Sequence, residues 1–224
     1  MQKVDDMITV NEAIKQRHSV RSYTDRAIPA DIADELRKLI ADCNREGGVN
    51  MQLVTGEPRA FSGTMAHYGK FSGVSNYIAL IGKKGSDIAL GYYGAKAVVL
   101  AQQLGLNTCW VGMTFSKVPE ALNIGEGEKV EAVIAIGYGA VQGVSHKVKT
   151  PEQVAPGYAA APQWFKDGVD TALLAPTAMN QQKFTFTLAE DGSVQSKAGL
   201  GFFAKMDLGI VRYFFELGSG RKVM

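Results

Sequence analysis

Apolar residues with helical spacing predict two helices in the first fifty residues. Residues 9–12 read Thr-Val-Asn-Glu, the pattern of a capping box, so we expect a short helix to begin there. After Pro29, apolar residues recur every three or four positions, and Asp31 is a suitable cap for a second helix. The Gly47-Gly48 pair is expected to end this second helix.

Two apolar runs in the middle of the chain predict strands, with a helix between them. Residues 76–82 have the pattern of a buried strand. Ser86 or Asp87 can then cap a long helix that ends at Gly105. Small residues on this helix would let another helix or a flat ligand approach closely, and they are Gly91, Gly94, Ala95, Ala97 and Ala101. Residues 128–137 are apolar on both faces, as is typical of a central strand.

The last third predicts a helix, a strand and a second helix. The first helix opens at Pro162 and is stopped by Pro176, and residues 184–188 alternate as an amphipathic strand. An apolar stripe over residues 208–217 predicts the last helix, which Gly218 would close. The pattern predicts both helices and strands, and we expect a single domain, 1–224. A weak common plan of helix, Asn/Gln loop, strand and helix suggests two related halves, 1–155 and 156–224.

Composition and charge exclude several classes of protein. The 224 residues are 46% hydrophobic, which is typical of a globular protein, and the net charge of +2 is scattered along the chain. We therefore expect neither nucleic acid nor a membrane surface as a partner. The sequence has no apolar signal core and no apolar run that could span a bilayer, so we expect a cytoplasmic protein. Cys43 and Cys109 are far apart in the sequence, and we expect both to be buried thiols. The histidines are dispersed, so we predict no metal site.

Two basic segments are candidates for binding an anion. Arg17-His18-Ser19-Val20-Arg21 places two guanidiniums and a hydroxyl within five residues, and a guanidinium matches the geometry of a phosphate or the edge of a heteroaromatic ring. The alternative is a solvated basic turn. In the run 146–149, Lys147 and Lys149 would point the same way if the segment is extended. The alternative there is a solvated surface loop.

Four segments together resemble the FMN-dependent nitroreductase family. They cover most of the chain, and they are Arg17–Arg21 with Tyr23 and Pro29, Leu104–Gly112, Ala135–Gly139 and Ala175–Gln182. The resemblance implies an α+β nitroreductase-like fold, in which helices flank a central mixed sheet, and FMN bound without a covalent link. Three of the segments follow the family's order along the chain, whereas the fourth is displaced.

The displaced segment bears on the number of cofactors. In the family, a Pro-Ser-x-x-Asn-x-Gln loop follows the second helix and reaches the flavin of the partner subunit. Here residues 43–52 keep only a remnant of that pattern, and Pro176–Gln182 is the better match. This arrangement is similar to a smaller subfamily with two nitroreductase-like halves in one chain. It implies one FMN per chain, and either a monomer that acts as a pseudo-dimer or a homodimer.

The resemblance also implies which residues of the first half bind FMN. Arg17, with His18 beside it, would meet the phosphate, and Ser19 and Arg21 would contact the ribityl and pyrimidine parts. A cation at Arg21 would stabilise the negative charge of the reduced flavin. The segment that includes Trp110, Val111 and Gly112 would offer backbone N–H groups to flavin N5. Without the family, Ser19 could equally be a helix or turn cap, and Trp110 a core aromatic.

Further residues with an implied FMN role come later in the chain. Lys147 and Lys149 would share the phosphate with Arg17. The displaced loop would contact the flavin edge through Pro176, Thr177, Ala178, Asn180 and Gln182. The alternative for Asn180 and Gln182 is that they cap a junction between a strand and a helix.

The implied function is a ping-pong hydride transfer. NADH or NADPH would reduce FMN at N5, and a flat acceptor such as a nitroaromatic or a quinone would then take the electrons. No side chain is expected to be catalytic, because the chemistry takes place on FMN N5. The alternatives are a flavin-binding carrier or sensor without turnover and, last, an interaction module that binds no flavin.

Overall fold

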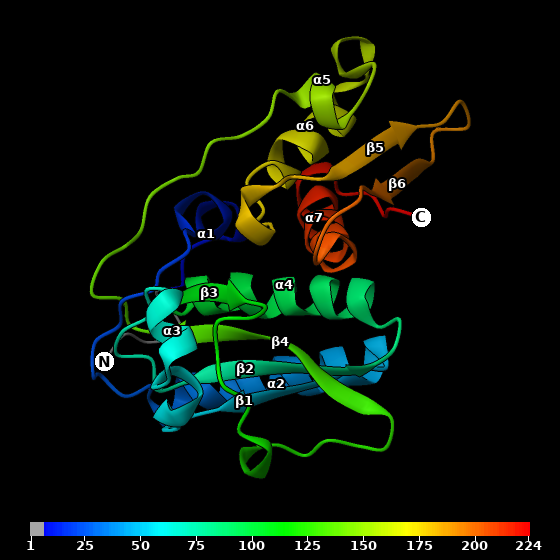
Figure 1. The fold of residues 1–224 in the computed structure, drawn as a ribbon. Coiled ribbons are helices and arrows are strands. Elements are labelled where there is room, and N and C mark those ends of the chain that lie inside the picture. The colour runs from blue at the N-terminus through cyan, green and yellow to red at the C-terminus, as the bar shows by residue number, and fades with distance from the viewer. Residues whose placement is uncertain (1–6) are drawn as a thin grey trace. The chain divides into compact units, whose positions relative to one another are not determined.

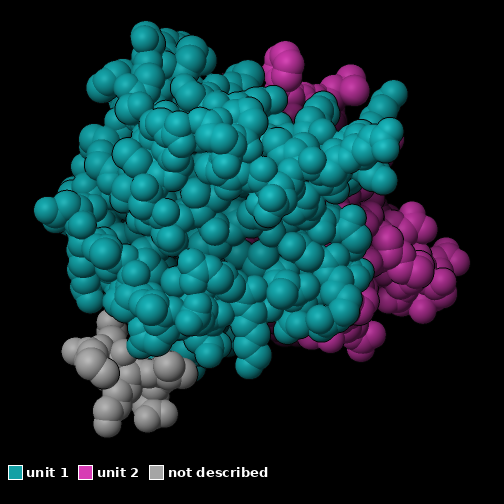
Figure 2. All heavy atoms as spheres, turned by 90° about the horizontal axis from the view of Figure 1, so that it is seen from below, with its two compact units in different colours: residues 1–86, 96–145 teal, residues 87–95, 146–224 magenta. Residues whose placement is uncertain are grey.

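A computed structural model describes residues 7–224 as two compact units. The first unit contains residues up to 86 together with 96–145, and the second contains residues 87–95 and 146–224 (Figure 2). The helix α4, Asp87–Gln103, therefore contributes its first nine residues to the second unit and the rest to the first. The chain passes from one unit to the other at residues 145 and 146.

The first unit is built on a four-stranded sheet with the strand order β1-β2-β4-β3 (Figure 1). All three strand pairs are antiparallel, and among the described residues of this unit parallel pairing occurs only as isolated bridges, at Ser19 with Thr108 and at Ser22 with Ser72. The elements of this unit are α1 (Val10–Gln16), α2 (Ala30–Gly47), β1 (Asn50–Val54), η2 (Pro58–Phe61), α3 (Thr64–Tyr68), β2 (Tyr77–Lys83), β3 (Asn107–Val111), η3 (Pro119–Ala121) and β4 (Glu128–Gly137).

The hydrophobic pattern explains the centre of this sheet. The strand β4 has the predicted bounds and lies between β2 and β3, and residues 132–137 are buried on both faces. The predicted strand at 76–82 is confirmed as β2. Residues 50–52, which the sequence suggested were a loop remnant, instead begin the edge strand β1. Asn50 and Gln52 donate from their amides to the carbonyl of Asn123.

The first two helices follow their predicted signals with one exception. The capping box at Thr9 and Glu12 is confirmed, with the Glu12 backbone N–H donating to the Thr9 hydroxyl at 3.2 Å. Gly48 ends α2 in the left-handed conformation. The prediction that Asp31 caps α2 is wrong, because the helix begins at Ala30 and Pro29 takes the cap position. Asp31 lies in the first turn, where its negative charge interacts favourably with the positive end of the helix dipole.

The second unit combines two packed helices with a β-hairpin. Its elements, besides the start of α4, are α5 (Pro151–Val154), η4 (Tyr158–Ala160), α6 (Gln163–Ala172), η5 (Ala178–Asn180), β5 (Phe184–Leu188), β6 (Val194–Ala198) and α7 (Ala204–Ser219). The strands β5 and β6 pair antiparallel, and the predicted strand at 184–188 is confirmed. The helix that opens after Pro162 ends at Ala172, before Pro176 could stop it.

Glycines allow the helices of this unit to approach closely. A Cβ at Gly91 would lie 2.0 Å from the carbonyl oxygen of Met206, and one at Gly209 would lie 2.0 Å from that of Ile88. The predicted close approach of another helix to α4 is therefore confirmed at Gly91. The prediction that Gly218 closes α7 is wrong, since the helix continues to Ser219. A Cβ at Gly218 would lie 2.2 Å from the Thr171 hydroxyl of α6, so this glycine serves packing instead.

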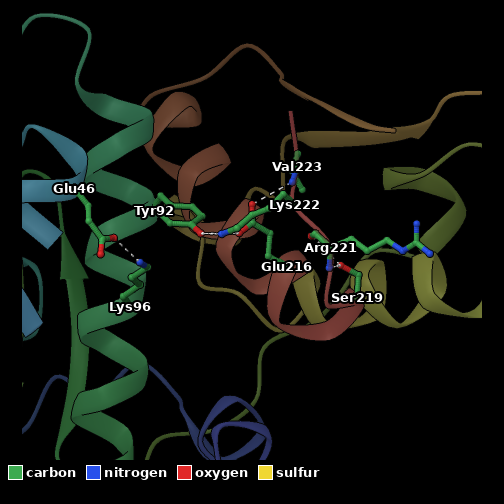
Figure 3. Close-up of polar contacts among 8 residues, drawn as sticks. All are labelled: Glu46, Tyr92, Lys96, Glu216, Ser219, Arg221, Lys222 and Val223. Carbon is green, nitrogen blue, oxygen red and sulfur yellow. Dashed lines mark hydrogen bonds and ion pairs between the residues drawn. The ribbon is translucent and has the colours of Figure 1, made fainter. Parts of the chain in front are cut away.

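The C-terminal residues are tied to α7 and to the start of α4 (Figure 3). The Glu216 carboxylate accepts hydrogen bonds from the Tyr92 hydroxyl at 2.6 Å and from the Lys222 ammonium at 2.7 Å. Its other oxygen accepts the backbone N–H of Val223 at 3.1 Å. One largely buried carboxylate therefore holds the tail through two donors and α4 through a third. In the first unit, Lys96 and Glu46 form an ion pair at 3.2 Å (Figure 3).

No helix among residues 7–224 is long and apolar enough to cross a membrane. The same residues contain no group of three or more histidine, cysteine, aspartate or glutamate side chains that could hold a metal ion.

Candidate functional site

The Arg17–Arg21 segment lies along the edge strand β3. Arg17 follows the last turn of α1, and its backbone N–H donates to the Ala13 carbonyl at 2.9 Å. Ser19 forms a parallel bridge with Thr108, and the Val20 N–H donates to the Thr108 carbonyl at 3.1 Å. The first two of the four sequence segments are therefore neighbours. The hypothesis of a solvated turn is wrong for Arg17, whose side chain is only 3% exposed.

The chain leaves β3 directly after Val20. The Arg21 carbonyl accepts the Ser72 N–H at 3.0 Å, and Tyr23 donates its own N–H to the Ser72 carbonyl at 3.0 Å. The next residue, Thr24, donates to the Tyr138 carbonyl at 2.8 Å, which brings the third segment, 135–139, into the same region. Three of the four segments thus meet within the first unit.

This divergence leaves the outer edge of β3 open at Trp110. Peptide groups along a strand point alternately to its two edges. The Thr108 carbonyl points to the Arg17–Arg21 segment, so the peptide group of Trp110, two residues on, faces the same edge. The indole N–H of Trp110 is also buried without a hydrogen bond in the described part of the chain. The Trp110 ring is partly buried, and among residues 7–224 no strand of the sheet pairs with β3 on the side away from β4, so fixed donors stand at an edge that is unpaired at Trp110.

Positive charge gathers at the same edge. Burial lowers the pKa of Arg17 to about 10. Burial also raises the pKa of the Cys109 thiol, whereas the nearby Arg21, Ser19 and Arg17 each act to lower it. Arg21 is exposed, its guanidinium lies 5.9 Å from the centre of the Phe71 ring, and it has no carboxylate partner among residues 7–224. The site therefore favours an anion. Both cysteines are buried, as predicted.

In the second unit, Gln182 binds the segment that contains the two lysines. Its side-chain oxygen accepts the backbone N–H of Lys149 at 2.8 Å, and its side-chain nitrogen donates to the Lys147 carbonyl at 2.8 Å. Its backbone carbonyl accepts the Lys149 ammonium at 2.8 Å. Asn180 also donates to the Lys147 carbonyl, at 2.8 Å. The lysine segment and the displaced loop are thus joined by side-chain hydrogen bonds.

The loop at 177–182 has an unusual backbone. Three residues of this loop have a positive φ, between 45° and 54°, and they are Met179, Asn180 and Gln182. Residues with a Cβ atom rarely adopt this backbone conformation. The loop is fixed by Asp207 of α7, whose carboxylate accepts the Ala178 N–H at 2.9 Å and the Gln181 side-chain N–H at 2.7 Å. Burial raises the pKa of Asp207 to about 6, against the effect of these two hydrogen bonds.

Asp207 and Gln181 were not among the residues that the sequence suggested. A signal for Asp207 was present, because it is the one acidic residue between Gly192 and Phe215 and it directly precedes the apolar stripe of the last helix. Gln181 carried no such signal, since it lies inside a segment whose other members match the family pattern.

The structure places the suggested residues in two groups. In the first unit it brings together Arg17, His18, Ser19, Arg21, Trp110, Val111 and Gly112 around the edge of β3. In the second unit it brings together Lys147, Lys149, Thr177, Asn180 and Gln182 by hydrogen bonds, with Ala178 joined to Asp207 and Pro176 buried directly before them.

Comparison with known proteins gives a family and a set of similar folds. A family model described as "Putative TM nitroreductase" matches residues 9–219. A solved structure described as a "putative nitroreductase" from Thermotoga maritima is 20% identical, covers 95% of this chain and 84% of its own, and has a TM-score of 0.69. Another, from Desulfovibrio desulfuricans and solved in complex with FMN, is 23% identical over 66% of this chain and 95% of its own, with a TM-score of 0.50. No curated protein matches the chain.

Proposed function

Because this chain belongs to the nitroreductase family, whose model matches residues 9–219, we propose that it is an FMN-dependent oxidoreductase. It takes a hydride from NADH or NADPH and passes the electrons to a flat acceptor such as a nitroaromatic or a quinone, in a ping-pong cycle. The nitroreductase-like fold and the FMN in a related structure support the proposal.

The open edge of β3 beside Arg17–Arg21 carries this proposal. It combines backbone donors, a hydroxyl and two guanidiniums, which is the donor set that a phosphorylated flavin requires. Arg21 is exposed and has no carboxylate partner among residues 7–224, so its charge is not already compensated by an acid. The residues present therefore fit FMN.

The residues at this edge have separate roles in the proposal. Arg17, whose burial holds its guanidinium in place, binds the phosphate, with His18 beside it. Ser19 and Arg21 bind the ribityl and pyrimidine parts. The peptide groups of Trp110 and Gly112, which flank Val111, orient the ring, since a backbone N–H is fixed and does not change protonation. When bound, FMN supplies the hydride chemistry, so these residues need only bind and orient it.

Residues of the second unit are proposed as additional ligands. Lys147 and Lys149 have no carboxylate partner among the described residues, so both can bind a phosphate oxygen. Pro176, Thr177, Ala178 and Asn180 contact the flavin edge. Only the first unit carries an Arg-x-Ser-x-Arg segment, which predicts one FMN per chain.

Anaerobic mixing of FMN-loaded protein with each nicotinamide tests the proposal. We expect the visible absorbance of the oxidised flavin to bleach rapidly and to return when a quinone or nitroaromatic is added. Flavin that stays oxidised in both mixtures would indicate a carrier or sensor and would refute the oxidoreductase. Protein that takes up no flavin would refute the proposal at its first step.

A further inference from the structure

The side chain of Gln182 makes its hydrogen bonds within the protein. The residue is 3% exposed, and a carboxamide has only two N–H donors. One donates to the Lys147 carbonyl at 2.8 Å and the other is within 2.8 Å of the Asn180 side-chain oxygen. The side-chain oxygen already accepts the Lys149 N–H. Donation from the side-chain N–H groups to a flavin would require one of these bonds to break.

The same contacts fix the Lys149 side chain at both ends. Its backbone N–H is bound by the Gln182 side chain, and its ammonium donates to the Gln182 carbonyl at 2.8 Å. An ammonium has three donors, so two remain after this bond. Residues 146–149 belong to no helix or strand, and a free lysine side chain there would sample many rotamers. Gln182 therefore restricts Lys149 in two ways: its backbone carbonyl binds the ammonium, and its side chain fixes the backbone from which the lysine side chain starts.

The backbone of Gln182 indicates that this arrangement is imposed. Its backbone φ is 45°, a value that a residue other than glycine keeps only when surrounding contacts hold it there. Those contacts are the bonds to Lys147 and Lys149 and a bond from the Gln182 N–H to the Thr177 hydroxyl at 3.1 Å. A glutamine that merely filled space would need none of them.

We propose that Gln182 is a positioning residue, which holds Lys149 ready for the FMN phosphate and does not touch the flavin. This inference rests on the proposed function, because it takes Lys149 as a phosphate ligand. Restricting the ammonium before binding removes an entropic penalty from the binding step, so the effect of Gln182 on FMN affinity passes through Lys149.

A double-mutant cycle on FMN affinity tests this coupling. Flavin-free protein is titrated with FMN, and binding is followed by quenching of FMN fluorescence. We expect Lys149→Gln to weaken binding about tenfold, as the loss of one charge-assisted hydrogen bond does. Gln182→Ala should weaken it several-fold in the wild-type background and less than about twofold in the Lys149→Gln background.

Gln181→Ala is the matched control. Gln181 fixes the same loop through Asp207 and the Phe202 carbonyl but makes no hydrogen bond to Lys147 or Lys149. We expect its FMN affinity to stay within about twofold of wild type. If Gln181→Ala weakens FMN binding as much as Gln182→Ala, loosening of the loop explains both and the positioning role is refuted. Equal effects of Gln182→Ala with and without Lys149→Gln would also refute it.

Two further measurements test the proposal if Gln182→Ala folds poorly. Gln182→Asn is one methylene shorter and cannot reach both lysine backbones, so it should match Gln182→Ala in the cycle. In the unmodified protein, amide hydrogen exchange should be much slower at Lys149 than at Val148, because only Lys149 has its N–H bound by Gln182. Equal exchange at the two residues would contradict the positioning role. Wild-type protein that binds no FMN would instead refute the proposed function.

Discussion

Asp207 gives a prediction about stability that can be worked from the structure. This carboxyl is 3% exposed, and burial raises its pKa from 3.8 to about 6. A raised pKa means that the folded state binds a proton more tightly than the unfolded state. The contribution to stability is therefore complete below pH 3.8 and is lost as the pH rises to about 6. A shift of this size corresponds to about 3 kcal/mol in total.

The substitution Asp207→Asn removes the titration and keeps the side chain's size. The asparagine oxygen can still accept the Ala178 N–H, whereas its nitrogen faces the Gln181 nitrogen and loses that bond. The lost bond lowers stability by about 1 kcal/mol at every pH. The part of the stability difference that depends on pH is therefore due to the titration of Asp207. The free energy of unfolding of wild type, minus that of the variant, should fall by about 1.3 kcal/mol between pH 5 and pH 7.

Urea unfolding of flavin-free protein at several pH values measures this difference. Subtracting the variant cancels the other titrating groups. Asp191→Asn is a suitable control, because hydrogen bonds to Ser193 lower the pKa of this exposed carboxyl below 3.8, so that it is ionised throughout this range and the corresponding difference should stay flat between pH 5 and pH 7. A difference for Asp207 that stays flat or rises from pH 5 to pH 7 would refute the reasoning about its burial.

Three further predictions concern packing, the C-terminal tail and the thiols. Gly209→Ala places a Cβ 2.0 Å from the Ile88 carbonyl oxygen, so we expect urea unfolding to show a loss of about 2 kcal/mol or more. An unchanged midpoint would contradict the close helix contact. Glu216→Ala removes the acceptor of Lys222 and Val223, so the Val223 amide should exchange much faster, and unchanged exchange would show that the tail is fixed otherwise. Burial raises the pKa of Cys43 to about 11 and also raises the pKa of Cys109. Neither thiol should therefore react with a disulfide reagent at pH 8 until urea unfolds the chain. Fast labelling of the folded protein would contradict this prediction.

The sequence predicted the centre of the fold better than its edges. The strand β4 was predicted with its full bounds because both of its faces are apolar, a pattern that few other structures share. The edge strand β1 was missed because Asn50 and Gln52 alternate with apolar residues and resemble a loop motif. Its pairing with β2, at Met51 with Leu80, is a long-range contact that no local pattern contains.

Glycines show the same limit for helices. Gly48 and Gly218 both lie near an apolar helical stripe, and both were expected to end a helix. Gly48 does so with a positive φ, whereas Gly218 lies inside α7 and makes room for Thr171 of α6. The sequence around Gly218 does not reveal the neighbouring helix, so the distinction depends on tertiary packing.

For the candidate site, the sequence suggested the residue types, and the structure adds their neighbours. Arg17 and Ser19 were predicted from their spacing, but their position beside Thr108 is a contact over some ninety residues of sequence. Gln182 was suggested as a flavin contact because its segment matches a family pattern. Only the hydrogen bonds to Lys147 and Lys149 show that its side chain is already occupied.

The account depends most on FMN binding at the open edge of β3. The direct test is an equilibrium titration of flavin-free protein with FMN, for wild type and for Arg21→Gln. We predict saturation at one FMN per chain, and a binding constant that Arg21→Gln weakens by about tenfold. Saturation at two FMN per chain, no binding, or an unchanged constant for Arg21→Gln would contradict the account.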